Sequence, residues 1–193
     1  MKSLSKREIK QLITALVFLI AALVTYLQPK IIKDGLETAQ KSQPGLYEVE
    51  EVSDGDTIIV NMNGIREIIR LIGVDTPETQ HPDRPLECYA AQASEYTRRL
   101  LTGQKVRLQV DPLNTNRDRY DRLLRYVFTQ DGRLVEQELI TEGYGFSYTQ
   151  FPFERKREFN EYEQQAKEGK KGLWGVCQVT ISESGLERTN PAM

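Results

Sequence analysis

A two-residue hairpin signal constrains the fold of this chain more than any other feature. Asn63-Gly64 stands between two runs rich in β-branched residues, 57–62 (TIIVNM) and 65–74 (IREIIRLIGV). This dipeptide favours the tight turns that join neighbouring antiparallel strands. An alternating run over residues 47–54 (YEVEEVSD) comes just before them. The three runs together predict a three-stranded antiparallel meander.

The segments after the meander predict a small barrel. Residues 87–101 repeat apolar side chains at helical spacing and end before Gly103. Two further strands and two further helices are expected, over residues 105–111, 122–129, 134–143 and 154–169. Five strands with a helix between the third and the fourth match the order of an OB-fold. We therefore expect a mainly-β α+β fold, a five-stranded OB-fold β-barrel with three α-helices; another small α+β sheet is the alternative.

The first 45 residues differ in charge from the rest. They hold seven Lys or Arg and three acids, which leaves 19 basic and 25 acidic side chains in the remaining 148 residues. An uncharged run of about 16 apolar residues lies between Lys10 and Lys30, somewhat shorter than an average spanning helix. We expect residues 1–29 to form an uncleaved membrane helix with a cytoplasmic N-terminus, and a cleaved signal is the alternative.

The remaining boundaries follow from composition. Residues 30–45 contain two Gly and a Pro without a sustained pattern and read as a linker. The folded domain is expected over residues 46–178, and residues 179–193 are expected to form a flexible tail. The folded domain would then be extracellular, on a single-pass membrane protein or after secretion.

Scarcity of two residue types limits the chemistry. The chain has one histidine and two cysteines, so a two-histidine or four-cysteine zinc site cannot be built within it. Carboxylates and arginines are plentiful, with 28 Asp and Glu against 26 Lys and Arg. Any enzymatic chemistry is therefore expected to rest on these two groups.

Three polar clusters lie at expected strand ends and turns, over residues 53–57 (SDGDT), 70–79 (RLIGVDTPET) and 118–122 (DRYDR). Each alone is typical of a solvated turn. Together they fit phosphodiester chemistry, because carboxylates can hold a hard cation and arginines can bind phosphate oxygens in pairs. A further carboxylate can deprotonate the attacking water.

These clusters carry a family resemblance. From residue 54 to residue 122 the chain follows the motif spacing of the staphylococcal nuclease (thermonuclease) family without an evident gap, and it resembles that family over roughly residues 47–175. The resemblance implies an OB-fold enzyme that hydrolyses DNA and RNA with Ca²⁺ and leaves 3′-phosphate ends.

The resemblance also implies a role for each matching residue. Asp56 and Asp75 would be side-chain ligands of Ca²⁺, with the carbonyl of Thr76 as a third ligand. Glu78 would be the general base. Arg70 and Arg122 would stabilise the phosphate in the transition state, and Arg119 and Tyr120 would contact a terminal phosphate of the bound nucleotide.

Two places depart from the family pattern. Asp121 stands where the prototype has glycine, so an added acid lies next to Arg122; it could weaken phosphate binding or point to solvent. The turn at residues 130–132 is one residue longer, which shifts the register after it. The resemblance implies that the base-stacking tyrosines fall within residues 144–153, where we expect Tyr148, with Phe151 as the alternative; ordinary packing is the competing interpretation of both rings.

The resemblance favours a disulfide between Cys88 and Cys177, since related sequences have cysteines at these two places; two separate buried thiols are the alternative. We expect a monomer that meets nucleic acid as substrate and the membrane through its first helix. A non-catalytic OB-fold nucleic-acid-binding module is the alternative function. The net charge of −6 after residue 45 argues against it, because such modules usually present a basic face.

Overall fold

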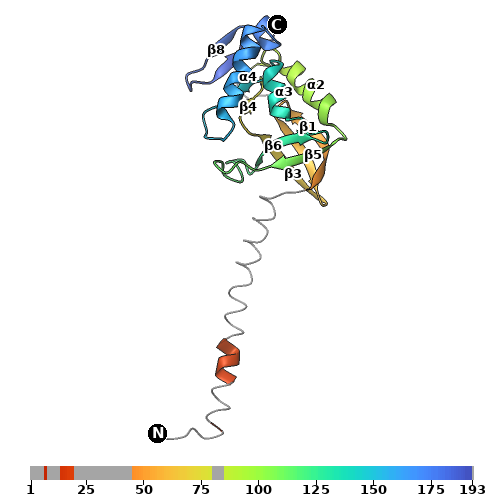
Figure 1. Ribbon diagram of the computed structural model, residues 1–193, viewed down its shortest axis with the longest axis vertical. Coiled ribbons are helices and arrows are strands. Elements are labelled where there is room, and N and C mark those ends of the chain that lie inside the picture. Colours follow the sequence, from red (N-terminus) through yellow and green to blue (C-terminus); the bar gives the residue numbers. More distant parts are fainter. Residues whose placement is uncertain (1–6, 8–13, 20–44, 80–84, 193) are drawn as a thin grey trace. The chain divides into compact units, whose positions relative to one another are not determined.

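The computed structural model describes residues 7, 14–19, 45–79 and 85–192 of the chain (Figure 1). The chain divides into two compact units, Met1–Ser42 and Gln43–Met193. In the first unit residues 14–19 are helical. Most of the expected membrane segment and nearly all of the expected linker lie outside the described residues. Within the described ranges, no helix is long and apolar enough to cross a membrane.

In the second unit, five strands close a barrel in the order β1-β2-β3-β6-β5, which confirms the five-stranded barrel. Neighbouring strands are antiparallel, apart from the parallel pair of β3 and β6. Pairing of β1 with β5 closes the barrel. The strands are Leu46–Asp54 (β1), Thr57–Met62 (β2), Ile65–Leu71 (β3), Lys105–Gln109 (β5) and Leu123–Thr129 (β6).

The hairpin between β2 and β3 forms as its sequence predicts. Met62 pairs with Ile65, which leaves a two-residue loop. Asn63 and Gly64 both have positive φ, at 57° and 90°. Such a loop needs left-handed backbone at both positions, and Asn and Gly adopt it at low cost.

The barrel interior holds the alternate apolar residues of each strand, because successive side chains of a strand point to opposite faces. Val60, Ile69, Val106 and Val127 are all fully buried. Burial of such side chains contributes roughly 1.5–3 kcal/mol each. The apolar residues of the alternating strands therefore form the core of the barrel.

The three predicted helices are present. They are Ala90–Leu101 (α2), Val135–Thr141 (α3) and Lys156–Glu168 (α4), and α3 lies between α2 and α4 in Figure 1. Helix α2 begins three residues later than predicted, because Tyr89 is in the left-handed region at φ 71°. Short elements that the sequence did not predict are Val74–Asp75 (β4), Phe146–Ser147 (β7) and Leu173–Val176 (α5).

The expectation of a flexible tail over residues 179–193 is wrong for the described part of it. Val179–Ile181 (β8) and Glu187–Thr189 (β9) pair as an antiparallel hairpin, and β8 lies beside α4 in Figure 1. The chain after the hairpin is fixed as well, since the amide of Cys88 donates to the carbonyl of Asn190 at 2.7 Å. The contact between Cys88 and Asn190 joins residues far apart in the sequence, so no local pattern predicts it.

A disulfide joins Cys88, just before α2, to Cys177, just after α5. This is the pairing that the resemblance implied. The bond fixes the start of β8 against the start of α2, because Cys177 comes two residues before that strand. The C-terminal hairpin therefore begins from an anchored point.

Candidate active site

One cavity of about 1070 Å³ gathers most of the predicted site residues. It lies where β2 begins and β3 ends, and the loop before β6 and the segment after β7 complete its wall. The predicted residues that line it are Asp56, Arg70, Asp75, Glu78, Arg119, Tyr120, Arg122 and Tyr148. Thr76, also predicted, is buried next to Asp75. The fold thus brings these residues together from four separate stretches of sequence.

Arg70, near the end of β3, holds the two predicted ligand carboxylates. Its Nη2 atom lies 3.1 Å from Oδ2 of Asp56 and 3.0 Å from Oδ1 of Asp75. Its Nη1 atom donates to the carbonyls of Leu71 and Val74 at 2.8 and 2.7 Å. Burial opposes the charge of Arg70, but the carboxylates of Asp56 and Asp75 outweigh it and raise its pKa. The guanidinium therefore stays charged.

Asp56 is fixed by its neighbours on both oxygens. Oδ1 accepts from the hydroxyl of Thr57 at 2.9 Å, and Oδ2 accepts from the amide of Thr76 at 3.0 Å. The close approach of the Thr76 segment to the Asp56 segment depends on Gly55, because a Cβ at that position would lie 2.7 Å from Oγ1 of Thr76. The glycine of the first polar cluster is therefore needed for close packing of two site segments.

Asp75 ends the short strand β4, which pairs with β7 through Phe146. The residue is 7% exposed, and its carboxylate accepts from arginines on both oxygens, from Arg70 on Oδ1 and from Arg188 on Oδ2, each at 3.0 Å. Burial raises the pKa of Asp75 to about 6, against the opposing charge of Arg70 and with the help of Asp56.

Glu78 lies in the loop after Asp75 and has a strongly raised pKa. Burial, followed by the charges of Asp56 and Asp54, raises the pKa of Glu78 to about 7. Its backbone is held in two places by Glu87, since its amide donates to Oε2 of Glu87 at 3.0 Å and its carbonyl accepts from the amide of Glu87 at 3.2 Å. A carboxylate with a pKa near neutrality is suited to general base catalysis.

The donor set suits a hard cation. Asp56 and Asp75 each place an oxygen about 3 Å from the same nitrogen of Arg70, so these two oxygens converge. Oγ1 of Thr76 is buried there and has no hydrogen-bond partner. Carboxylate and carbonyl oxygens are the ligands that Ca²⁺ prefers. Among the described residues, no group of three or more Asp, Glu, His or Cys side chains could hold a metal ion, so a bound ion would also need backbone oxygens and water.

Arg122 faces the cavity from just before β6 and is oriented by Asp118. Oδ2 of Asp118 lies 2.7 Å from both Nε and Nη2 of Arg122. Oδ1 of the same carboxylate accepts from the amides of Tyr120 and Arg122 at 2.9 and 3.0 Å. The third polar cluster is therefore a turn whose first acid positions its last arginine.

Asp121, the acid next to Arg122, points away from it. The residue is left-handed, with φ 65°, which explains why glycine is suited to this position. Its side chain is 89% exposed, and Oδ1 lies 3.5 Å from Nε of Arg117. Asp121 therefore pairs with Arg117, and Arg122 pairs with Asp118.

Three aromatic side chains also line the cavity, those of Tyr120, Tyr148 and Phe151. Nη2 of Arg119 donates to the hydroxyl of Tyr120 at 2.7 Å, and the Arg119 guanidinium stacks over that ring. On the opposite segment, Tyr148 and Phe151 both line the cavity with ring centroids 5.9 Å apart. The amide of Tyr148 donates to the carbonyl of Gly73 at 2.8 Å, which fixes this segment beside β4. Both candidates for the stacking ring are therefore available.

Three residues of this site were not predicted from the sequence. Asp118 was inside a quoted cluster but had no role assigned. Glu87 supports Glu78 through a contact across nine residues, and Arg188 reaches Asp75 across 113 residues. One local signal could have identified the hairpin that carries Arg188. It is the turn dipeptide Ser184-Gly185, which stands between two short runs of alternating side chains.

Comparisons with known proteins agree with the geometry. Residues 68–176 match the family described as "Staphylococcal nuclease homologue". A thermonuclease of Staphylococcus hyicus is 35% identical over 169 residues, covering 86% of this chain and 98% of that protein. A thermonuclease of Staphylococcus intermedius is 38% identical, covering 69% of this chain and 79% of that protein. The endonuclease YncB of Bacillus subtilis (strain 168) is 36% identical, covering 69% and 64%.

Proposed function

The chain belongs to the staphylococcal nuclease family, and we propose that it is a calcium-dependent phosphodiesterase that hydrolyses DNA and RNA to products with 3′-phosphate ends. The observation that carries this proposal is the single cavity lined by Asp56, Asp75, Glu78, Arg70 and Arg122. Each residue type needed for phosphodiester hydrolysis is present in it. Nuclease activity itself also agrees with the relatives, which are a thermonuclease and an endonuclease by name.

The arginines bind and stabilise the phosphate. Arg70 lines the cavity from near the end of β3, and Arg122 lines it from just before β6, the strand that pairs with β3. Two guanidinium groups supply donors to the non-bridging oxygens and offset the charge that develops in the transition state. Removal of one such donor costs about 10²–10³-fold in rate in comparable sites.

Glu78 takes the proton of the attacking water. Its raised pKa means that it accepts a proton readily near neutral pH. Asp56, Asp75 and the carbonyl of Thr76 would hold Ca²⁺, and a bound Ca²⁺ would polarise the phosphoryl oxygen and reduce its repulsion by the acids.

The aromatic groups orient the nucleotide. Tyr148 offers a ring for a base, and base stacking on an aromatic ring contributes roughly 1–3 kcal/mol without demanding a particular base. Arg119 and Tyr120 also line the cavity, where a terminal phosphate would meet a cation and a hydroxyl.

We also propose that the domain acts as a monomer outside the cytoplasm, held by the N-terminal segment. Support comes from the basic and apolar sequence of residues 1–29. The disulfide between Cys88 and Cys177 agrees with a non-reducing compartment, since structural disulfides are rare in the cytoplasm.

The proposal is tested by the products of the full-length chain purified in mild detergent. Single-stranded DNA and RNA, labelled at the 5′ end, are incubated with Ca²⁺ or with EDTA. We expect cleavage of both in Ca²⁺ and none in EDTA, and we expect fragments whose 3′ ends become extendable only after phosphatase treatment. Binding of both substrates without cleavage would instead support the non-catalytic OB-fold module.

A further inference from the structure

The C-terminal hairpin contributes a third arginine to the site. Leu186 and Arg188 both line the cavity. Nη1 of Arg188 lies 3.0 Å from Oδ2 of Asp75, and its side chain is only 16% exposed. The arginine is therefore a wall residue of the site rather than part of a solvated tail.

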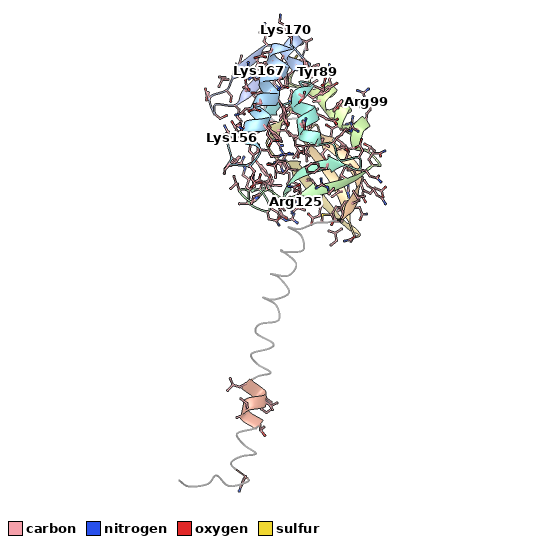
Figure 2. All side chains as sticks on the ribbon, in the orientation of Figure 1. Tyr89, Arg99, Arg125, Lys156, Lys167 and Lys170 are labelled. Atoms are coloured by element: carbon pink, nitrogen blue, oxygen red, sulfur yellow. A yellow bond between two sulfur atoms is a disulfide. The ribbon has the colours of Figure 1, made fainter. Side chains whose placement is uncertain are left out.

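The hairpin is fixed where it carries this arginine. On one side of Arg188, Glu187 lies 2.9 Å from Nζ of Lys167 of α4, which Figure 2 labels. On the other side, the hydroxyl of Thr189 donates to the carbonyl of Cys88 at 2.9 Å. The hairpin tip is held as well, since Nε2 of Gln150 donates to the carbonyl of Ser184 at 2.8 Å. Both sequence neighbours of Arg188 are therefore anchored, and its guanidinium is presented from a fixed backbone.

The two arginines on Asp75 are held differently. Arg70 bonds two backbone carbonyls and also Asp56, so its position is fixed by four acceptors. Among the described residues, the hydrogen-bond partner of the Arg188 guanidinium is Asp75. An arginine has five N–H donors. Arg188 can therefore change partner while Arg70 keeps its place.

We propose that Arg188 is a further phosphate-binding residue of this site, paired with Asp75 until a cation takes that carboxylate and then free to bind the substrate phosphate. The inference rests on the proposed function, because it takes Asp75 as a ligand of the ion. Two physical arguments support it. A divalent cation and a guanidinium repel each other when both contact one carboxylate. A released arginine on the cavity wall has a phosphodiester as its natural bidentate acceptor.

Opposite effects on the ion and on the substrate follow from this exchange. With Arg188→Gln, Ca²⁺ no longer competes with Arg188 for Oδ2 of Asp75, and the binding of Ca²⁺ tightens, while Arg70 still holds Oδ1. The substrate loses one charge-assisted contact, and the KM for nucleic acid rises. If Arg188 had a purely structural role, its replacement would not raise the affinity for Ca²⁺. It would also not raise KM while leaving kcat nearly unchanged.

The first test measures Ca²⁺ binding without nucleic acid. Titration calorimetry is carried out on the full-length chain in mild detergent, as wild type, Arg188→Gln and Arg66→Gln. Arg66 is a matched control, because it also pairs with acids, Glu50 and Glu51, but is exposed and does not line the cavity. We expect Arg188→Gln to bind Ca²⁺ about threefold to tenfold more tightly, a size typical of one coupled charge, and Arg66→Gln to match wild type. Unchanged or weaker binding by Arg188→Gln would overturn the proposal.

The second test measures cleavage of single-stranded DNA at saturating Ca²⁺. We expect Arg188→Gln to raise KM about tenfold, the effect of one lost charge-assisted hydrogen bond, with kcat changed less than threefold. Arg188→Lys keeps the charge but not the planar donor pair, so it should restore the Ca²⁺ affinity of wild type and leave KM raised. An unchanged KM in Arg188→Gln contradicts the inference.

The outcomes separate the inference from the proposed function. Absence of cleavage by wild type in Ca²⁺ refutes the proposed function. Cleavage by wild type with an Arg188→Gln enzyme of the same KM and Ca²⁺ affinity refutes the inference alone. Thermal unfolding of each variant identifies loss of the fold, and Arg188→Lys provides the comparison if Arg188→Gln is less stable.

Discussion

At the scale of single residues, Arg70 organises the site before any ligand arrives. One of its nitrogens contacts Asp56 and Asp75, and the other is bonded to two backbone carbonyls. A guanidinium held by four acceptors keeps two acids close together in a buried place, where their mutual repulsion would otherwise be costly. The position of the predicted ligands therefore depends on an arginine that also has a predicted role with phosphate.

Glu78 supplies a pH prediction at the same scale. Its pKa is raised to about 7, first by burial and then by Asp56 and Asp54. A general base works when deprotonated, so at low Ca²⁺ we expect kcat/KM to rise about tenfold per pH unit below pH 7 and to level off above it. Saturating Ca²⁺ adds positive charge nearby and should shift the rising limb to lower pH.

The measurement is a pH–rate profile at two Ca²⁺ concentrations, with Glu78→Gln as the comparison. Glu78→Gln should lose at least about 10²-fold in activity and also lose the rising limb. A rising limb that persists in Glu78→Gln would assign the base to another group.

At the scale of elements, α3 is joined to β6 by a buried acid. The amide of Val127 donates to both carboxylate oxygens of Glu136, at 3.0 and 3.2 Å. Glu136 is fully buried, and burial raises its pKa well above the usual value against the opposing hydrogen bonds of its own amide and Val127. The folded state therefore holds a proton that the unfolded chain releases at lower pH.

This proton determines how stability depends on pH. Because the folded pKa of Glu136 is the higher one, its contribution is fully present below the unfolded pKa, about 4.3, and is lost as pH rises through the folded pKa. Glu136→Gln stays neutral and can still accept from Val127. We expect similar free energies of unfolding at pH 5 and a variant more stable than wild type by on the order of 1–3 kcal/mol at pH 8.

Urea unfolding of both proteins at the two pH values measures this difference. Glu142→Gln is a suitable control at the end of the same helix, since Glu142 pairs with Lys171 and its side chain is 50% exposed. A variant that is less stable than wild type by the same amount at pH 5 and pH 8 would show that Glu136 contributes through packing alone.

The sequence predicted elements with a local pattern and missed those defined by distant partners. The barrel strands alternate and the Asn63-Gly64 turn fixes its own geometry. β4 and β7 have two residues each and exist only because they pair with each other across the chain. The C-terminal hairpin is likewise fixed by Cys177 and Lys167 rather than by its own composition.

The site follows the same rule. Asp56, Arg70, Asp75 and Glu78 lie within 23 residues of one another, so their motif could be identified in the sequence. Arg188 could not be identified in this way, because its contact with Asp75 spans 113 residues. Local motifs therefore identified residues that the fold gathers in one cavity, and they missed Arg188 on the wall of that cavity.

At the scale of the whole molecule, the chain combines two units of different chemistry. Residues 1–45 are basic and partly apolar, and the rest carries an excess of six acids. An acidic domain keeps nucleic acid from binding everywhere on its surface and leaves binding to a cavity with local arginines. The modest net charge of the chain, −2, averages these two parts.

The N-terminal unit gives a prediction of its own. If residues 1–29 anchor the protein, the full-length chain should sediment with membranes and resist extraction by high salt. A chain beginning at Leu46 should stay in the supernatant with the same activity per molecule. Recovery of the full-length chain in the soluble fraction, with an intact N-terminus by sequencing, would contradict the anchor.

The central claim is that the cavity around Arg70 and Arg122 cleaves phosphodiesters. The most direct test compares single-turnover cleavage of single-stranded DNA in saturating Ca²⁺ by wild type, Arg122→Gln and the exposed control Arg66→Gln. We predict a rate about 10²–10³-fold lower for Arg122→Gln, a wild-type rate for Arg66→Gln and similar thermal stability for all three. Cleavage by folded Arg122→Gln at the wild-type rate would contradict the account.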